Sequence, residues 1–107
     1  PKGDVREAST VAVIQAVKET PRTLPHCHPM PIEGCTGDWK VEEAGLRCTV
    51  SVRTHWTTGV EMEALTAVSV ACLTLFDMLK AVDKTMSIDA LRVTAKEGGR
   101  SGAWRGE

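Results

Sequence analysis

Apolar residues recur at helical spacing between Thr58 and Lys84, and no glycine or proline interrupts residues 61–82. One side of this stretch forms a strong stripe at three- and four-residue steps, and the opposite side is also mostly apolar or small. A helix over 61–82 would be roughly 35 Å long. Being apolar on nearly all sides, it should pack on a sheet and on a second layer such as another subunit. The stripe consists of Leu65, Val68, Cys72, Leu75, Phe76, Leu79 and Val82, and the opposite side of Ala67, Val70, Ala71, Thr74 and Ala81.

A first helix is predicted from Asp4 to Thr20. Asp4 is a good N-cap, with an acidic residue three positions later as in a capping box. Pro21 should end the helix. Its predicted apolar stripe consists of Ala8, Val11, Ile14 and Val17.

Two strands are predicted over 35–43 and 46–56, joined at Ala44-Gly45. In the second strand, Leu46, Cys48, Val50 and Val52 alternate with polar residues, as expected for a half-buried antiparallel strand. A further strand is expected over 87–96. The order helix, two strands, helix, strand predicts an α+β fold, with helices on one face of an antiparallel sheet. A ferredoxin-like unit would need one more strand before the first helix.

Length and charge narrow the functional classes. The chain has 107 residues, which predicts a single domain, and a formal net charge of -1. This charge argues against a general binder of nucleic acid or membrane surfaces. The sequence shows neither an apolar run of membrane-spanning length nor a secretion signal, so we expect reduced cysteines and a cytoplasmic protein. Because the sequence starts at Pro1 without a methionine, we expect it to be a piece of a longer chain.

Charges within the long apolar helix are candidates for chemistry. Glu61 and Glu63 would lie in its first turn, where acidic residues also stabilise the helix dipole. Asp77 and Lys80 lie one turn apart. Two interpretations are open: an ion pair at the helix surface, or an acid/base pair in a dry pocket. Glu63 and Asp77 share a face but stand roughly 21 Å apart along the axis. A compact site using both would require a long ligand or a site shared between subunits.

The proline-rich stretch 21–31 is the second candidate region. Its rigid backbone holds His26 and His28 two residues apart, with Cys27 between them and Cys35 nearby. This spacing fits none of the usual zinc patterns, so a functional histidine is preferred to a metal ligand. Near the C-terminus, glycines accompany Lys96 and Arg100, which indicates either an anion-binding loop or a solvated tail.

Five motifs together resemble the cyclic pyranopterin monophosphate synthase family, the MoaC-type proteins of molybdenum-cofactor biosynthesis. The resemblance runs nearly end to end, and the spacing between GVEMEAL and DMLKAVD is its most specific part. The family's region before KGDV, which adds a strand and an arginine to the site, is absent here. The motifs are KGDV at 2–5, LPHCHPMP at 24–31, TGVEMEALTAVSV at 58–70, DMLKAVDK at 77–84 and KEGGRSG at 96–102.

The resemblance implies an enzyme that converts a cyclised dihydro-GTP into cyclic pyranopterin monophosphate and releases pyrophosphate. Asp77 matches the family's proposed catalytic aspartate, and Lys80 matches its neighbouring lysine. His28 and Lys2 match an active-site histidine and an essential lysine. Position 26 departs from the family, since an apolar residue is expected there. The resemblance implies that the substrate is bound by His26, Cys27, His28, Glu61, Met62, Glu63, Lys96 and Arg100.

The resemblance also implies a homo-oligomer, a hexamer built as a trimer of dimers, with active sites at the dimer interface. It implies a nucleotide substrate supplied by a radical-SAM GTP cyclase, and no resident cofactor or metal. Magnesium bound to the substrate triphosphate is compatible with the resemblance, but the sequence has no carboxylate cluster that predicts it. Two alternatives are a non-catalytic nucleotide- or protein-binding module and a small metal protein using His26, Cys27, His28 and Cys35.

Overall fold

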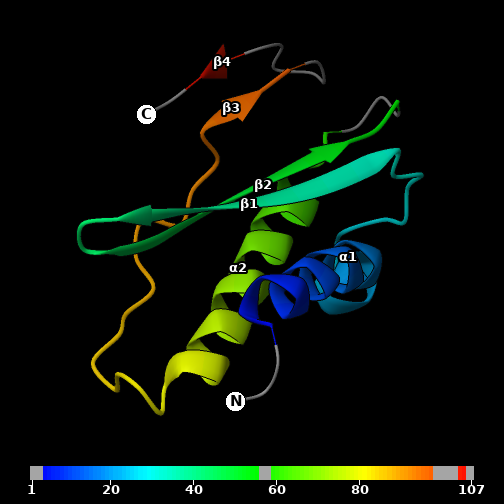
Figure 1. Cartoon of the computed structure of the whole chain (residues 1–107). Coiled ribbons are helices and arrows are strands. Elements are labelled where there is room, and N and C mark those ends of the chain that lie inside the picture. Colours follow the sequence, from blue (N-terminus) through cyan, green and yellow to red (C-terminus); the bar gives the residue numbers. More distant parts are fainter. Residues whose placement is uncertain (1–3, 56–58, 98–103, 106–107) are drawn as a thin grey trace.

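A computed structural model describes residues 4–55, 59–97 and 104–105. Two helices lie on one face of an antiparallel hairpin, with a second, shorter strand pair beyond it (Figure 1). The α+β class is therefore confirmed, and this arrangement does not contradict a ferredoxin-like unit. The elements are α1 Val5–Thr23, β1 Gly34–Glu42, β2 Gly45–Arg53, α2 Glu61–Leu79, β3 Ala95–Lys96 and β4 Trp104–Arg105.

The β1–β2 hairpin confirms the period-two prediction. Gly34 pairs with Arg53 and Glu42 with Gly45 at the two ends of the ladder. The inward positions of β2 are Cys48, Val50 and Val52, whose alternate neighbours are exposed. Leu46 was predicted to be inward but is 46% exposed, because it lies at the hairpin tip beside the turn.

Helix α1 begins as predicted but ends later. Asp4 is the N-cap, and its side chain accepts a hydrogen bond from the Glu7 backbone N–H at 3.1 Å. The prediction that Pro21 ends the helix is wrong, because α1 continues to Thr23. Proline lacks the N–H of one helical hydrogen bond, yet the Leu24 N–H still donates to the Thr20 carbonyl at 3.0 Å. Pro21 is therefore accommodated in the last turn.

The buried face of α1 differs from the predicted stripe. Val11 and Ile14 are 49% and 41% exposed, whereas Val13 is only 1% exposed. Small side chains dominate the true contact face, so α1 and α2 can approach closely, and larger residues occupy the outer side. Two buried hydroxyls on this face donate to backbone carbonyls one turn earlier, which satisfies them without a partner on α2. This face consists of Ser9, Ala12, Val13, Ala16, Val17 and Thr20.

The Val13→Ala variant is expected to lose about 2–3 kcal/mol of unfolding free energy, because two buried methyl groups leave a cavity. Val11→Ala is the matched control on the same helix, and it should change stability by less than about 0.5 kcal/mol. Both substitutions alter helix propensity equally, so their difference reports burial. Urea denaturation followed by circular dichroism measures both. Equal losses would show that the Val11 face is covered in solution.

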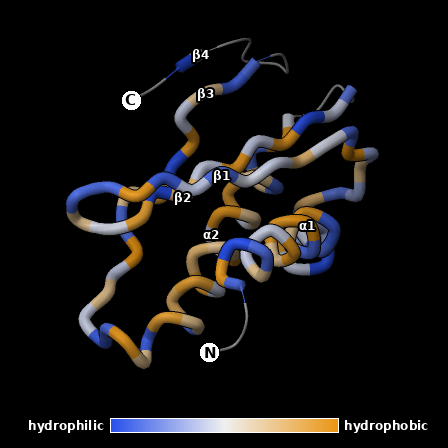
Figure 2. Tube along the Cα trace, viewed as in Figure 1, coloured by the Kyte–Doolittle hydropathy of each residue, from blue (hydrophilic) through white to orange (hydrophobic). Residues whose placement is uncertain are grey.

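Helix α2 forms the centre of the fold and is hydrophobic along most of its length (Figure 2). Its buried apolar residues are Ala67, Ala71 and Leu75. Ala67 and Ala71 come from the predicted small side and pack in the core with residues of α1, whereas Leu75 comes from the predicted stripe. The helix ends at Leu79, three residues before the predicted Val82. The Val82 and Asp83 backbone N–H groups both donate to the Leu79 carbonyl, and beyond them the Asp83 side chain accepts hydrogen bonds from the backbone and hydroxyl of Thr85 in a local turn.

By length and composition alone, α2 meets the criterion for a membrane span, contrary to the expectation from sequence. The same test is passed by core helices of globular proteins, and α2 packs on both α1 and β2. Its ends carry the acidic residues Glu61, Glu63 and Asp77. Only 22% of this apolar stretch is buried within the single chain, so α2 is a core helix on the side that faces α1 and β2.

The predicted strand over 87–96 is mostly wrong. Only β3, at Ala95–Lys96, forms a ladder, and its partner is β4. Ala90 has a φ of 57°, in the left-handed region, which interrupts an extended strand. A cavity also lies between residues 88–95 and β2, so the ladder partner that a strand needs is not adjacent. Leu91 is consequently 48% exposed.

Candidate functional site

The N-terminal turn of α2 holds a buried carboxylate. Glu63 is only 2% exposed, and its Oε2 accepts a hydrogen bond from the Cys27 thiol at 3.5 Å. This contact fastens the proline-rich loop to the helix start, because the two residues are far apart in sequence. Burial, together with the negative charge and hydrogen bond of Glu63, raises the pKa of Cys27. Cys27 is thus kept as a thiol that donates to the carboxylate.

Glu63 also lines a cavity of about 330 Å³ at the end of α1. This volume is at the lower end of the range for small-molecule sites, so the cavity can hold only part of a large nucleotide. A carboxylate at its wall suits ligand N–H groups, and Lys18 adds one cationic side chain. The other lining residues are Val17, Pro21, Pro29, Met30 and Ile32.

Glu61 and Lys96 form an ion pair beside this region. Lys96 Nζ lies 2.9 Å from Glu61 Oε2, and the lysine side chain is only 13% exposed. The hydrogen bond from Lys96 and the backbone N–H of Glu61 itself lower the pKa of Glu61. The carboxylate folds back over Gly59, where a Cβ would collide with it. The pair joins β3 to the start of α2, two segments that the sequence assigned to the same site.

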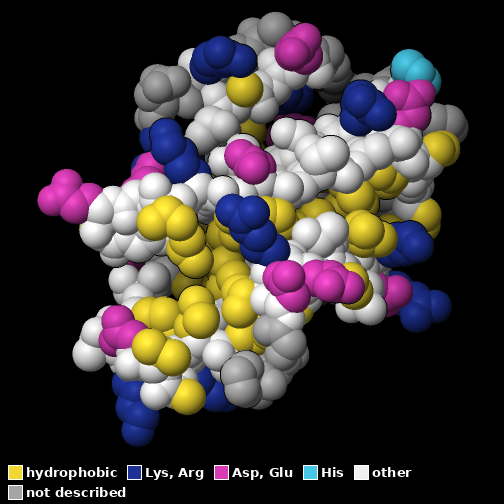
Figure 3. All heavy atoms as spheres, in the orientation of Figure 1, with side chains coloured by type: hydrophobic (Ala, Val, Ile, Leu, Met, Phe, Trp, Pro, Cys, Tyr) yellow, Lys and Arg dark blue, Asp and Glu magenta, His cyan; other side chains and the backbone are white. Residues whose placement is uncertain are grey.

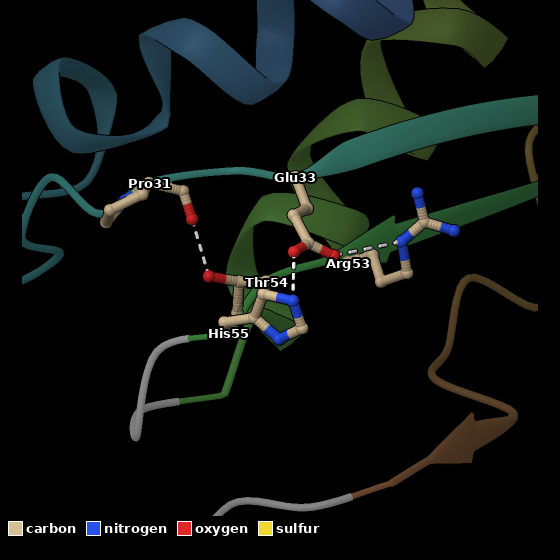
Figure 4. A network of polar contacts seen from close by, with 5 residues as sticks. All are labelled: Pro31, Glu33, Arg53, Thr54 and His55. Atoms are coloured by element: carbon tan, nitrogen blue, oxygen red, sulfur yellow. Dashed lines mark hydrogen bonds and ion pairs between the residues drawn. The ribbon is translucent and has the colours of Figure 1, made fainter.

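A second polar network lies at the open end of the hairpin, and sequence reasoning missed it (Figure 4). Glu33 contacts His55 through one carboxylate oxygen and Arg53 Nε through the other, at 3.5 Å. Thr54 Oγ1 donates to the Pro31 carbonyl and so ties the proline-rich loop to β2. The hairpin register could have indicated part of this network, since Gly34 pairs with Arg53 and places Glu33 alongside.

The remaining residues of the predicted substrate loop are open to solvent. His26 and His28 are exposed, whereas Cys27 between them is half-buried against Glu63. Met62 is 46% exposed at the start of α2. The structure therefore brings Cys27 to Glu63 and Lys96 to Glu61. Lys2 and Arg100 lie outside the described residues.

Asp77 and Lys80 lie at the other end of α2. Lys80 Nζ is 2.7 Å from Asp77 Oδ1, and the two side chains are 56% and 54% exposed. Within one chain they form the surface ion pair rather than a pair in a dry pocket. Glu63 and Asp77 are separated by fourteen residues of continuous helix, so the single chain leaves the two groups of candidates apart, roughly 21 Å along the axis.

A metal centre receives no support from the part of the chain that the structure describes. No group of three or more His, Cys, Asp or Glu side chains there could hold a metal ion. Cys27, Cys35, Cys48 and Cys72 are all free thiols.

These features define a two-layer α+β domain with a charged, partly enclosed site at the start of its central helix. A family model described as the MoaC family matches residues 1–99. The chain is 52% identical over 104 residues to the cyclic pyranopterin monophosphate synthase of Corynebacterium efficiens. The matched residues make up 97% of this chain and 67% of that protein. It is 48% identical over 105 residues to the enzyme of the same name from Novosphingobium aromaticivorans, covering 98% and 67%. It is 50% identical over 109 residues to the enzyme of that name from Chloroflexus aggregans, and the match covers 100% of this chain and 66% of that protein.

The chain belongs to the MoaC family. It spans about two thirds of the length of these relatives. The resemblance stated from its five motifs is therefore confirmed.

Replacing Lys96 by Met is expected to raise the pKa of the Glu61 carboxyl toward its ordinary value. In the wild type the Glu61 pKa is lower in the folded state than in the unfolded state, where it is about 4.3. The ion pair therefore stabilises the fold at pH values above the unfolded-state pKa. This stabilisation is lost as the pH falls through the folded-state pKa. The stability difference between wild type and K96M should therefore shrink on acidification. A carboxyl-carbon NMR titration measures the Glu61 pKa directly. Lys84→Met, at an exposed lysine, is the control, and an equal Glu61 pKa in wild type and K96M would contradict the pairing.

Proposed function

We propose that this protein is a cyclic pyranopterin monophosphate synthase of molybdenum-cofactor biosynthesis. Its substrate would be (8S)-3′,8-cyclo-7,8-dihydroguanosine 5′-triphosphate, and its products cyclic pyranopterin monophosphate and diphosphate. The observation that carries the proposal is the similarity to relatives of this name, about half identical over nearly the whole chain. The reaction class that follows is a lyase that releases diphosphate.

The chemistry divides into proton transfers and a phosphate cyclisation. Opening and rebuilding the rings requires groups of opposite type close together, and Asp77 and Lys80 lie 2.7 Å apart. We assign Asp77 as base and Lys80 as acid. Glu63, buried at the cavity wall, would accept N–H groups of the guanine-derived ring, with Glu61 and Met62 beside it. Cys27 and His26 would line the same face of the substrate.

Cyclisation requires a ribose hydroxyl to attack the α-phosphate while diphosphate leaves. The cations assigned to the phosphates are His28, Lys2, Lys96 and Arg100, which would stabilise the developing charge. In the described structure Lys96 is paired with Glu61, so the phosphates would compete for this lysine. The proposal needs no resident cofactor, and Mg²⁺ would act only as a companion of the substrate triphosphate.

We further propose that the active site is shared between subunits. Asp77 and Lys80 at one end of α2 cannot reach the cavity at the other end within one chain. An isologous dimer would bring one subunit's Asp77 to its partner's Glu63 and form two equivalent sites. The proposed assembly is a hexamer, a trimer of such dimers, working in the cytoplasm downstream of a radical-SAM GTP cyclase.

Turnover is the direct test. The purified protein is supplied with the cyclised dihydro-GTP, and diphosphate and the cyclic pyranopterin are measured by enzymatic assay and mass spectrometry. We expect both products in equal amounts. A folded protein that binds the nucleotide but forms neither product would overturn the enzymatic proposal in favour of a binding module.

A further inference from the structure

A second cavity, of about 350 Å³, is lined by none of the residues of the proposed active site, although Ala64 and Ala95 adjoin Glu63 and Lys96. It is enclosed by β2, by α2 and by residues 88–95. Hydrophobic side chains gather on this face of the molecule, between the hairpin and α2 (Figure 3). Two cysteines line the cavity from opposite walls, Cys48 from β2 and Cys72 from α2. The proposed function uses neither of them.

Both thiols border the same cavity, from two elements that pack on each other. Cys48 lies at an inward position of β2, and Cys72 lies in the middle of α2. The neighbouring Cys48 thiol lowers the pKa of Cys72 to about 7, while Cys72 and burial raise the pKa of Cys48. Thiolate is the reactive form of cysteine, so the lowered pKa favours Cys72 as the attacking thiol. Cys48 is placed to resolve an adduct on Cys72.

We propose that Cys48 and Cys72 are a reversible redox-modification site, at which a disulfide fastens β2 to α2. A disulfide oxidant of the glutathione type supplies the chemistry. The Cys72 thiolate attacks one sulfur of the oxidant, breaking its S–S bond and releasing one glutathione thiolate. Cys48 then loses its proton and attacks the Cys72 sulfur, which releases the second glutathione. The protein loses two electrons and two protons, and the oxidant becomes two thiols.

The other cysteines provide an internal contrast. Cys27 donates its hydrogen bond to the Glu63 carboxylate, and its raised pKa disfavours the thiolate. Cys35 packs on the apolar core from β1, where it is paired in register with Val52. We therefore expect oxidation to select the pair formed by Cys48 and Cys72. This selectivity does not depend on the proposed enzymatic activity.

The crosslink should have a measurable effect on stability. It closes a loop from residue 48 to residue 72, which removes conformations from the unfolded chain. For a loop of this length the melting temperature should rise by about 10 °C or more. The link would join two elements, α2 and β2, that already pack together in the folded chain.

The experiment treats the native protein with glutathione disulfide and follows intact mass, peptide mapping and thermal unfolding. We expect a loss of two hydrogen masses, one Cys48–Cys72 linked peptide, a higher melting temperature and reversal by dithiothreitol. The C27S variant should form the same Cys48–Cys72 link as wild type, and C48S should stop at a glutathione adduct on Cys72. Adducts mainly on Cys27 or Cys35, a disulfide between chains, or no mass change would overturn the proposal. The C72S variant should give no link, so a link in this variant would also overturn it.

Discussion

Asp77→Asn is expected to lower the turnover number by at least about 100-fold, because the change removes the proposed base without altering its shape. The folded state should hardly be affected. Asp77 pairs with Lys80 on the surface of the single chain, and exposed pairs three residues apart contribute only about 0.2–0.5 kcal/mol. A large loss of turnover would therefore reflect chemistry rather than unfolding. Steady-state kinetics beside thermal unfolding of the same samples provides the measurement.

Glu19→Gln is the matched control for this variant. Glu19 also pairs with a basic residue three positions later, Arg22, with 3.7 Å between their charged atoms. The pair is exposed, lies on α1 and has no proposed role in the reaction. The two substitutions remove the same kind of charge and the same kind of helix pair. If D77N kept more than about a tenth of wild-type turnover, Asp77 could not be the general base. Equal losses in E19Q and D77N would assign the effect to helix charge instead.

Local patterns were sufficient to predict most of the elements. Alternation along 46–52 and the short link at Ala44 predicted a hairpin that the structure confirms, because strand pairing over a two-residue loop is a local property. The helix starts were also predicted well, since caps and acidic first turns are read from adjacent residues. The ends were less accurate. Pro21 was tolerated in a last turn, and α2 ended before Val82.

The choice of contact face could not be predicted from hydrophobicity. Val11 and Ile14 are among the most apolar residues of α1, yet its neighbour α2 presents Ala67 and Ala71 at zero exposure. Close approach of two helices selects small residues, and this depends on the partner's surface rather than on the helix's own sequence. The strand predicted over 87–96 also depends on a partner. Its alternation predicts a strand, but the local sequence cannot supply a neighbouring strand for hydrogen bonding.

The candidate site was partly predictable from its motifs. Glu61 and Glu63 were both named, but only the structure separates them: Glu63 is buried against Cys27, and Glu61 is paired with Lys96. Such contacts join segments that are distant in sequence, and no local pattern specifies them. The placement of Cys48 and Cys72 on one cavity has the same character. Helical geometry did predict one long-range fact, the separation of Glu63 from Asp77.

That separation predicts that two inactive variants will restore each other. D77N and E63Q should each lose at least about 100-fold in turnover. When the two variants are co-expressed, roughly a quarter of wild-type activity should be recovered. Half of the randomly formed dimers contain one chain of each variant, and one of the two sites in each such dimer is intact. Glutamine is nearly isosteric with the buried Glu63, so the fold should be preserved. Co-purification with two affinity tags isolates the mixed dimers, in which half of the sites should be active.

Wild-type chains mixed with the D77N/E63Q double variant give the opposite result. If each site takes Asp77 from one chain and Glu63 from its partner, every mixed dimer is inactive, and roughly a quarter of the sites remain. If each site lies within one chain, roughly half remain, and mixing the two single variants restores nothing. The two mixtures therefore change in opposite directions under the two arrangements. Activity near half in the second mixture, with none in the first, would require Glu63 and Asp77 of one chain to act together. The roughly 21 Å of helix between them would then have to be spanned by the substrate itself.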